Sequence, residues 1–195
     1  LAVFSVSQSG ISASTWSSVK VAALGNSNLV KQGDMVIALG NTFSYADGIS
    51  YGIISSTDYK ETFYDGECGV IATDISASKE GSGVLFNLDG EVVGLALSSI
   101  WEEEETNTAN AYAISDLKSV IELLANGENV PYIGVYGTAV TSRLKEEQGM
   151  PEGVYVIDVD PDSPAMSAGI QSGDIICEIN REKVTNLVTY QKAVL

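Results

Sequence analysis

The stretch Thr73–Leu95, TDISASKEGSGVLFNLDGEVVGL, sets a serine between two glycines and then two apolar runs separated by Asp89-Gly90. The Asp-Gly pair predicts a tight β-hairpin, because the turn requires a positive φ that these residues tolerate. Ser82 therefore lies just before a hairpin, at a place where a nucleophile can be presented. The simpler alternative is that Ser82 is a turn residue beside glycines, and the pattern alone leaves both interpretations open.

The chain before and around this stretch reads as short strands separated by turn residues, which is typical of an antiparallel barrel or sandwich. Apolar and β-branched residues predict strands at residues 1–7, 19–24, 35–39, 49–55, 68–75 and 83–87. The period then becomes helical over SDLKSVIELLANG, with Ser115 as the expected N-cap and Gly127 as the expected C-cap. A helix that closes a β-domain predicts a domain boundary near residue 130.

The remainder of the chain predicts a small α+β module. GVYVIDVD and GDIICEIN read as strands, and NLVTYQKAVL opens a helix. SPAMSAG predicts a short helix, with Ser163 as its cap, Pro164 at its first position and Gly169 at its end.

Composition excludes several classes of function. The net charge of −16 argues against a nucleic-acid partner, because few basic groups are present to neutralise phosphates. The chain holds no histidine and only two cysteines, Cys68 and Cys177, which lie far apart, so we expect neither a zinc site nor a disulfide framework. We expect no metal and no cofactor. A calcium site at Asp158, Asp160 and Asp162 is a remote alternative, since these residues alternate along a strand end without the liganding loop.

An ordered set of motifs resembles the HtrA/Deg serine proteases. ALGNSNLVKQGDMVIALGNTF (23–43), ISYGIISS, LFNLDGEVVGL and NAYAISDLKSVIELL follow in that family's order with nearly its spacing. The tail, from YIGVYG to QKAVL, looks like the PDZ domain that follows the protease domain in the family.

The resemblance implies a mainly β fold. Residues 1–129 would be the second, antiparallel β-barrel of a trypsin-like protease domain with its C-terminal helix, and residues 130–195 an α+β PDZ domain truncated at its C-terminal end. LAVFSV, at residues 1–6, looks like the family strand that begins after the catalytic aspartate. We therefore expect the chain to be a fragment.

The resemblance also identifies Ser82 as the catalytic serine of a peptide-bond hydrolase. A serine hydroxyl needs a base, and without histidine we expect no hydrolysis by the isolated chain. Lys79 as the base of a Ser-Lys dyad is a remote alternative, because nothing in the sequence indicates the burial that would lower its pKa. The expected oxyanion loop, Glu80, Gly81 and Gly83, departs from the family pattern, since Glu80 replaces a glycine. The alternative is therefore a catalytically inactive pseudoprotease that acts as a peptide-binding module.

Residues of the substrate cleft follow from the same resemblance. GLALSS matches the family strand that pairs with substrate, which assigns Ala96, Leu97 and Ser98 to the cleft, and Tyr112 of NAYAI would wall the specificity pocket. An ordinary barrel strand accounts for these apolar residues equally well.

The PDZ segment would bind a peptide C-terminus by adding it as a strand, with backbone N–H groups holding the carboxylate. Tyr132, Ile133, Gly134 and Val135 match the carboxylate-binding loop. The facing wall would come from the last helix, through Leu187, Tyr190, Gln191 and Val194. Burial of these apolar residues in a core is the alternative.

The partners implied are unfolded proteins or peptide C-termini. By resemblance we also expect an extracytoplasmic protein that forms a homo-trimer and is membrane-anchored through segments missing from this chain.

Overall fold

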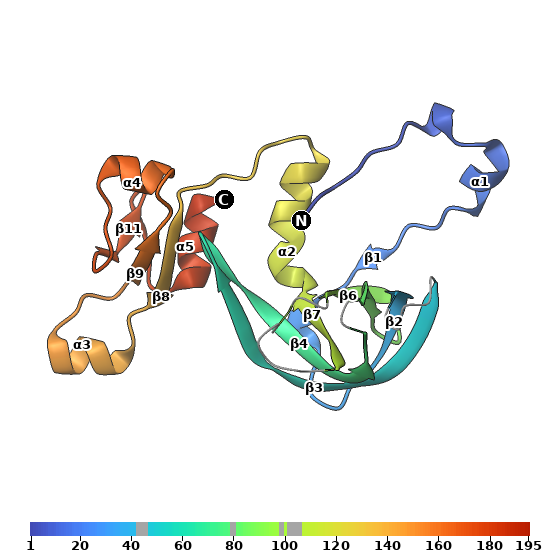
Figure 1. The fold of residues 1–195 in the computed structure, drawn as a ribbon, viewed down its shortest axis with the longest axis horizontal. Helices are drawn as coiled ribbons and strands as arrows, with labels where there is room; N and C mark the ends of the chain where they lie inside the picture. Colours follow the sequence, from blue (N-terminus) through green and yellow to red (C-terminus); the bar gives the residue numbers. More distant parts are fainter. Residues whose placement is uncertain (42–46, 79–80, 98–99, 101–106) are drawn as a thin grey trace. The chain divides into compact units, whose positions relative to one another are not determined.

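The computed structural model describes residues 1–41, 47–78, 81–97, 100 and 107–195. These residues form two compact units (Figure 1). The first unit is Leu1–Tyr59 with Gly69–Glu128, and the second unit is Lys60–Cys68 with Asn129–Leu195. The second unit thus combines the C-terminal part of the chain with a short segment from near residue 65. No sequence pattern indicated this combination.

A closed antiparallel barrel is the centre of the first unit. Neighbouring strands follow the order β6-β5-β2-β3-β4-β7, and β7 pairs again with β6 to close the ring. The strands are β2 (Met35–Asn41), β3 (Gly48–Phe63), β4 (Gly66–Ser76), β5 (Ser82–Phe86), β6 (Glu91–Leu97) and β7 (Thr108–Ala113). The mainly β fold with an antiparallel barrel is therefore confirmed, although β3 and β4 are longer than the sequence predicted.

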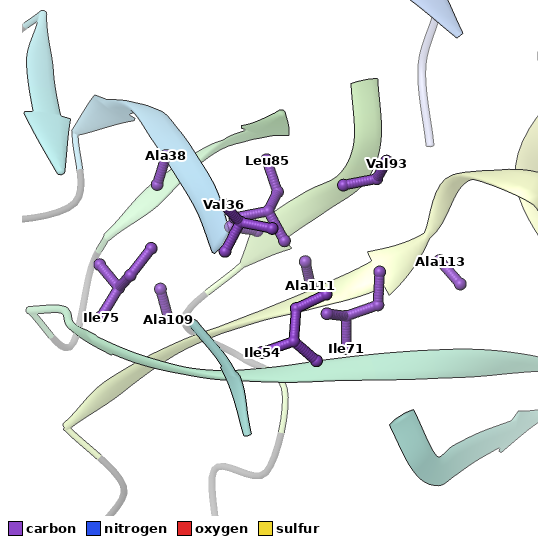
Figure 2. Close-up of a cluster of buried hydrophobic side chains, with 11 residues drawn as sticks. Val36, Ala38, Ile54, Ile71, Ile75, Leu85, Val93, Ala109, Ala111 and Ala113 are labelled. Atoms are coloured by element: carbon purple, nitrogen blue, oxygen red, sulfur yellow. The ribbon is translucent and has the colours of Figure 1, made fainter. Parts of the chain in front are cut away.

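Small and β-branched side chains fill the barrel. Figure 2 shows Val36 of β2, Ile54 of β3, Ile71 of β4 and Leu85 of β5 gathered in its interior. Each of these four side chains is at most 2% exposed. Burying one such side chain stabilises a fold by roughly 1.5–3 kcal/mol, so this cluster fixes which faces of the strands point inward. Alanines on β2, β6 and β7 complete the cluster: Ala38, Ala96, Ala109, Ala111 and Ala113.

The hairpin predicted from Asp89-Gly90 is confirmed. Gly90 has a φ of 79°, and its N–H donates to the Asn87 carbonyl oxygen at 3.1 Å. The side-chain oxygen of Asn87 accepts from the backbone N–H groups of Asp89 and Glu91 at 3.1 and 2.9 Å. Hydrogen bonds within the turn that joins β5 to β6 thus hold its conformation. The resulting hairpin pairs Ser82 with Leu97.

The predicted helix is α2 (Ile114–Ala125), but its N-cap is not Ser115. Ala113 occupies the N-cap position, and Ser115 lies inside the first turn. The orphan N–H of Ser115 donates instead to the Ser27 hydroxyl at 3.0 Å, and the Ser27 N–H donates to the Ser115 hydroxyl at 2.9 Å. These two hydrogen bonds between residues far apart in sequence therefore take the place of a local side-chain cap. At the other end the Gly127 prediction is close: Asn126 is the C-cap, and Gly127 follows it with a φ of 74°.

The strand predicted at residues 1–7 is wrong. This segment has no strand and leads into η1 (Gln8–Gly10) and α1 (Ala13–Ser18). Phe4 is 89% exposed and Val6 73% exposed, so the apolar pattern lies against no core here. β-Propensity yields a strand only where an edge is present to pair with, and no described strand pairs with these residues. Of the strand predicted at residues 19–24, only β1 (Ala23–Leu24) forms. It precedes η2 (Ser27–Leu29) and pairs in parallel with β6.

The second unit is an α+β module. β8 (Val135–Ala139), β9 (Val154–Val159) and β10 (Ile175–Ile176) form one sheet, and β11 (Glu178–Ile179) pairs with β12 (Glu182–Lys183). The predicted strand GDIICEIN is thus divided between two sheets. The helices are α3 (Ser142–Gln148), which the sequence analysis did not predict, α4 (Pro164–Ala168) and α5 (Leu187–Val194).

The short helix α4 confirms the capping signals read from the sequence. The Ser163 hydroxyl accepts from the Met166 N–H at 3.2 Å, Pro164 is in the first turn, and Gly169 ends the helix with a φ of 84°. The last helix, α5, begins with a reciprocal capping box between Asn186 and Thr189. These caps hold both helices against β8 and β9, which frame the second candidate site.

None of the helices in the described ranges is both long and apolar enough to cross a membrane.

Candidate functional site

Ser82 is the first residue of β5. It lies opposite Asn41 of β2 and Leu97 of β6, and it is exposed. The preceding Gly81 is buried, and its N–H donates to the Ser78 carbonyl oxygen at 2.9 Å. Ser82 is therefore exposed at the beginning of a barrel strand.

Glycines allow β2 and β5 to approach closely at this point. A Cβ atom at Gly40 would lie 2.5 Å from the Ser82 carbonyl oxygen, and one at Gly83 would lie 2.7 Å from the Leu39 carbonyl oxygen. Gly40 also has a φ of 143°. A side chain at Gly40 or Gly83 would fit only if backbone atoms moved, so the position of Ser82 depends on both glycines.

Three residues of interest around Ser82 lie outside the described residues: Lys79, Glu80 and Ser98. The oxyanion loop assigned to Glu80, Gly81 and Gly83 stays a prediction, as does the Ser-Lys dyad. No histidine exists anywhere in the chain to serve as base.

The remaining residues assigned to the cleft fall on two neighbouring strands. Ala96 lies in the barrel core at 3% exposure, whereas Leu97 is exposed on β6 directly opposite Ser82. Tyr112 is half-buried on β7, opposite Leu95 of β6 and Val70 of β4. The structure thus brings Leu97 beside the serine, while Ala96 faces the barrel interior.

The second candidate site is the segment Tyr132–Val135, called the carboxylate loop below. Its backbone N–H groups converge on one carboxylate, that of Asp65 in the turn between β3 and β4. The N–H groups of Ile133 and Gly134 donate to Asp65 Oδ2 at 2.6 and 2.7 Å, and that of Val135 donates to Oδ1 at 3.0 Å. Asp65 is only 9% exposed, so these bonds form in a largely dehydrated site. Hydrogen bonds to a charged acceptor are about twice as strong as neutral ones.

The conformation of the carboxylate loop requires Gly134. Its φ is 91°, and a Cβ atom on it would lie 2.2 Å from the Ser163 Cβ. The loop carbonyls point the opposite way: the Ile133 carbonyl accepts from the Ala165 N–H at 2.9 Å, and that of Gly134 from the Asp160 N–H at 3.0 Å. Because Ala165 of α4 and Asp160, which follows β9, hold these carbonyls, the N–H groups are oriented towards the anion before any ligand arrives.

Tyr190 of α5 adds a fourth donor. Its hydroxyl donates to Asp65 Oδ1 at 2.7 Å, and the side chain is completely buried. Burial raises the pKa of the Tyr190 hydroxyl, and the hydrogen bond to Asp65 raises it further. The hydroxyl therefore keeps its proton and remains a donor throughout the neutral range.

The other residues predicted for this site differ in how deeply they are buried and in what they contact. Val135 and Leu187 are buried in the core of the second unit, and Ile133 and Val194 pack against that core while partly buried. Gln191 lies beside the turn, since a Cβ atom at Gly66 would be 2.8 Å from its Cδ. Val135 and Leu187 are therefore core residues in this structure, which is the alternative that the sequence left open.

Tyr132, also predicted for this site, is exposed and donates its hydroxyl to Asp160, which raises the pKa of Tyr132 to about 12. Tyr64, the neighbour of Asp65, donates its hydroxyl to Asp158 Oδ2 at 2.8 Å. Two of the three carboxylates of the calcium alternative, those of Asp158 and Asp160, thus accept from tyrosines. Within the described part of the chain, no group of three or more acidic, cysteine or histidine residues is arranged to hold a metal ion.

Asp65 is the residue that sequence reasoning missed. The Asp65-Gly66 pair is a hairpin signal of the same kind as Asp89-Gly90, and it would have located the turn at Tyr64–Asp65. The contact with the carboxylate loop joins residues 68–70 positions apart, which no local pattern reveals.

Comparisons with known proteins identify the family of the chain. Residues 155–195 match the PDZ domain family. A probable periplasmic serine endoprotease DegP-like of Marinomonas sp. (strain MWYL1) is 34% identical over 173 residues, which cover 85% of this chain and 36% of that protein. The serine protease Do-like HtrB of Bacillus subtilis (strain 168) is 30% identical over 185 residues, covering 85% of this chain and 40% of that protein. The chain thus spans somewhat more than a third of these relatives.

Solved structures agree in fold. The HtrA-type protease AlgW with tripeptide superimposes with a TM-score of 0.59 at 24% identity, covering 89% of this chain and 60% of that one. The barrel, the helix that follows it and the α+β module therefore recur together in that protein. On this fold and these relatives, the chain belongs to the HtrA/DegP-type serine proteases that carry a PDZ domain.

Proposed function

We propose that this chain binds the C-termini of peptides and unfolded proteins through its PDZ domain, as part of an HtrA-like serine endopeptidase. The observation that carries the proposal is the convergence of three backbone N–H groups and the Tyr190 hydroxyl on one carboxylate. A peptide C-terminus offers the same group, and a backbone that adds to the edge of β8 delivers it to this place. AlgW, a neighbour in fold, was solved with a tripeptide, which supports peptide binding by this chain.

The test is peptide binding to the whole chain, followed by fluorescence anisotropy. Fluorescein-labelled hexapeptides ending in valine or phenylalanine, with a free carboxylate, are expected to bind. The same peptides with a C-terminal amide are expected to bind at least tenfold more weakly, since the amide lacks the negative charge to which the four donors bind (~1.4 kcal/mol per tenfold). Equal binding of acid and amide would overturn the proposal.

For the protease activity we propose that Ser82 is the nucleophile and that Gly81 and Gly83, with Glu80, form its oxyanion loop. Ala96, Leu97, Ser98 and Tyr112 would line the substrate cleft. The relatives named as serine endoproteases support peptide-bond hydrolysis by the family. The isolated chain would not hydrolyse peptides by a Ser-His-Asp route, because it contains no histidine.

A pseudoprotease is the second candidate, and Glu80 favours it. A carboxylate at the position of an oxyanion-hole glycine would oppose the negative charge that develops on the substrate, where loss of one donor alone costs about 3 kcal/mol. Fluorophosphonate labelling of the natively expressed protein, with Ser82→Ala as control, separates the two candidates. Labelling that the substitution abolishes indicates a working protease. Absence of labelling in folded protein favours the pseudoprotease.

An extracytoplasmic location is supported by relatives named as periplasmic. We also propose a homo-trimer for the natively expressed protein, which light scattering coupled to size-exclusion chromatography would test.

A further inference from the structure

The carboxylate loop already holds a carboxylate that belongs to the chain itself. Asp65 uses the three loop N–H groups and the Tyr190 hydroxyl, with both of its oxygens engaged. A peptide C-terminus that used these donors would have to take the place of Asp65. The inference drawn from this rests on the peptide-binding function proposed above.

One backbone group of Asp65 also bonds to the first residue of β8. The Asp65 N–H donates to the Val135 carbonyl oxygen at 2.7 Å, as an added strand would, and the side-chain Oδ1 of Asp65 accepts from the Val135 N–H. The left-handed φ of 63° at Asp65 turns its side chain into the loop while the chain continues to Gly66. Gly66 then lies against Gln191 of α5, the helix that would form the other wall of a peptide groove.

Contacts at the surface of the second unit hold the turn in place. The Tyr64 ring meets that of Tyr136 edge-on, with ring centroids 5.8 Å apart, and its hydroxyl donates to Asp158. Tyr64 is 41% exposed, whereas Asp65 is 9% exposed. The turn is therefore held by the buried Asp65, by the contact of Gly66 with Gln191 and by these exposed contacts of Tyr64.

We propose that the turn Tyr64–Gly66 is an internal ligand of the PDZ domain, in which the Asp65 side chain takes the place of a peptide's C-terminal carboxylate. Peptide binds only after this turn has left the carboxylate loop. The exchange conserves the hydrogen bonds of the loop, because one carboxylate replaces another and no buried N–H group is left without an acceptor.

Covalent attachment makes the turn an effective competitor. An acceptor held on the same chain acts at a high effective concentration, in the millimolar range for short flexible tethers. The apparent affinity for peptide is then reduced by the fraction of molecules in which the turn has left the loop. Affinity for peptide in this chain is consequently set by the stability of the docked turn as well as by the groove.

The experiment compares Asp65→Ala with Asp58→Ala and the unaltered chain, using the labelled hexapeptides with free carboxylates. Asp58 is an exposed aspartate of β3 in the same hairpin, so its substitution removes the same charge without touching the loop. Asp65→Ala is expected to tighten peptide binding about ten- to a hundredfold, corresponding to a docked fraction of about 90–99%. Asp58→Ala is expected to bind as the unaltered chain does.

Amide signals of Ile133, Gly134 and Val135 provide a second measurement. In ¹H–¹⁵N correlation spectra Asp65→Ala should shift these signals upfield, and a free-carboxylate peptide should move them back towards their positions in the unaltered chain. If Asp65→Ala fails to fold, Asp65→Glu retains the charge but misplaces the carboxylate by one methylene, and an intermediate gain in affinity is expected.

The outcomes separate the two proposals. Peptide binding of equal affinity in the unaltered chain and in the folded Asp65 variant overturns the internal ligand and leaves peptide binding intact. Weaker binding in the variant overturns it too, since Asp65 would then support the groove. Absence of binding to every folded variant overturns the proposed function itself.

Discussion

The two candidate sites of this chain differ in how completely their geometry is built. At Ser82 the strands supply position, through the close approach at Gly40 and Gly83, but the chain contains no histidine to activate the hydroxyl. At the carboxylate loop all donors are oriented and engaged on one anion. A nucleophile depends on partners from several segments, whereas an anion site can be completed by the backbone of a single loop and one helix. This chain therefore supplies every donor of the loop by itself, whereas it supplies no histidine base for Ser82.

The largest effect should come from the glycine of the loop. Gly134→Ala is expected to destabilise the second unit by about 2–4 kcal/mol, because it adds a strained φ and a clash with Ser163. Gly149→Ala is the matched control: its φ is 66°, but a Cβ atom there meets nothing within 4 Å. The control should cost only about 1 kcal/mol in urea unfolding. Equal losses would show that space around Gly134 is not restrictive.

Removal of the fourth donor should have an intermediate effect. Tyr190→Phe keeps the ring in the core and deletes the bond to Asp65, which is expected to cost about 1.5–3 kcal/mol of unfolding free energy as a hydrogen bond to a charged group. Tyr64→Phe, which removes an exposed hydroxyl bonded to Asp158, is the control and should cost less than Tyr190→Phe. A double-mutant cycle that combines Tyr190→Phe with Asp65→Ala should show that their losses of unfolding free energy are not additive.

Alkaline pH should weaken the second unit by a smaller amount. The pKa of Tyr132 is raised to about 12 from its ordinary value of 10.0, and that of Tyr190 is raised as well. A raised pKa in the folded state means that the stabilisation is complete below pH 10 and is lost as the pH rises through the folded pKa. Urea midpoints of the second unit should therefore fall above pH 10, and Tyr190→Phe should flatten this fall.

The smallest effect should be at the other site. Ser82→Ala removes an exposed hydroxyl at the edge of the barrel and should change the unfolding free energy by less than about 0.5 kcal/mol. Thermal unfolding of the barrel with and without the substitution measures this directly. A larger loss would mean that the serine has a structural role, which would weaken its assignment as nucleophile.

Sequence patterns predicted the features whose causes are local. The Asp89-Gly90 hairpin and the capped α4 depend on a few neighbouring residues, and both are confirmed. The strand predicted at residues 1–7 failed, because a strand needs a partner edge as well as a suitable composition. Ser115 failed as a cap because Ser27, far away in sequence, meets the start of α2 instead.

The carboxylate loop was located from its resemblance to a family. That resemblance did not identify Asp65 as the group that the loop binds. Gly134 can be read from the motif, since the turn needs a residue that tolerates positive φ. Asp65 cannot be assigned to the loop in this way, because a turn signal gives the shape of a hairpin and not the surface against which the hairpin rests.

The discontinuous composition of the second unit has a practical consequence for dissecting the protein. Lys60–Cys68 belongs to this unit although the sixty residues Gly69–Glu128 separate it from Asn129. An excised PDZ segment that begins near residue 129 would lack the turn, and with it the acceptor for the N–H groups of Ile133, Gly134 and Val135. Such a segment would report the intrinsic affinity of an unoccupied groove. Affinities measured on excised domains and on the intact chain are therefore different quantities here, and their ratio would measure how firmly the turn is held.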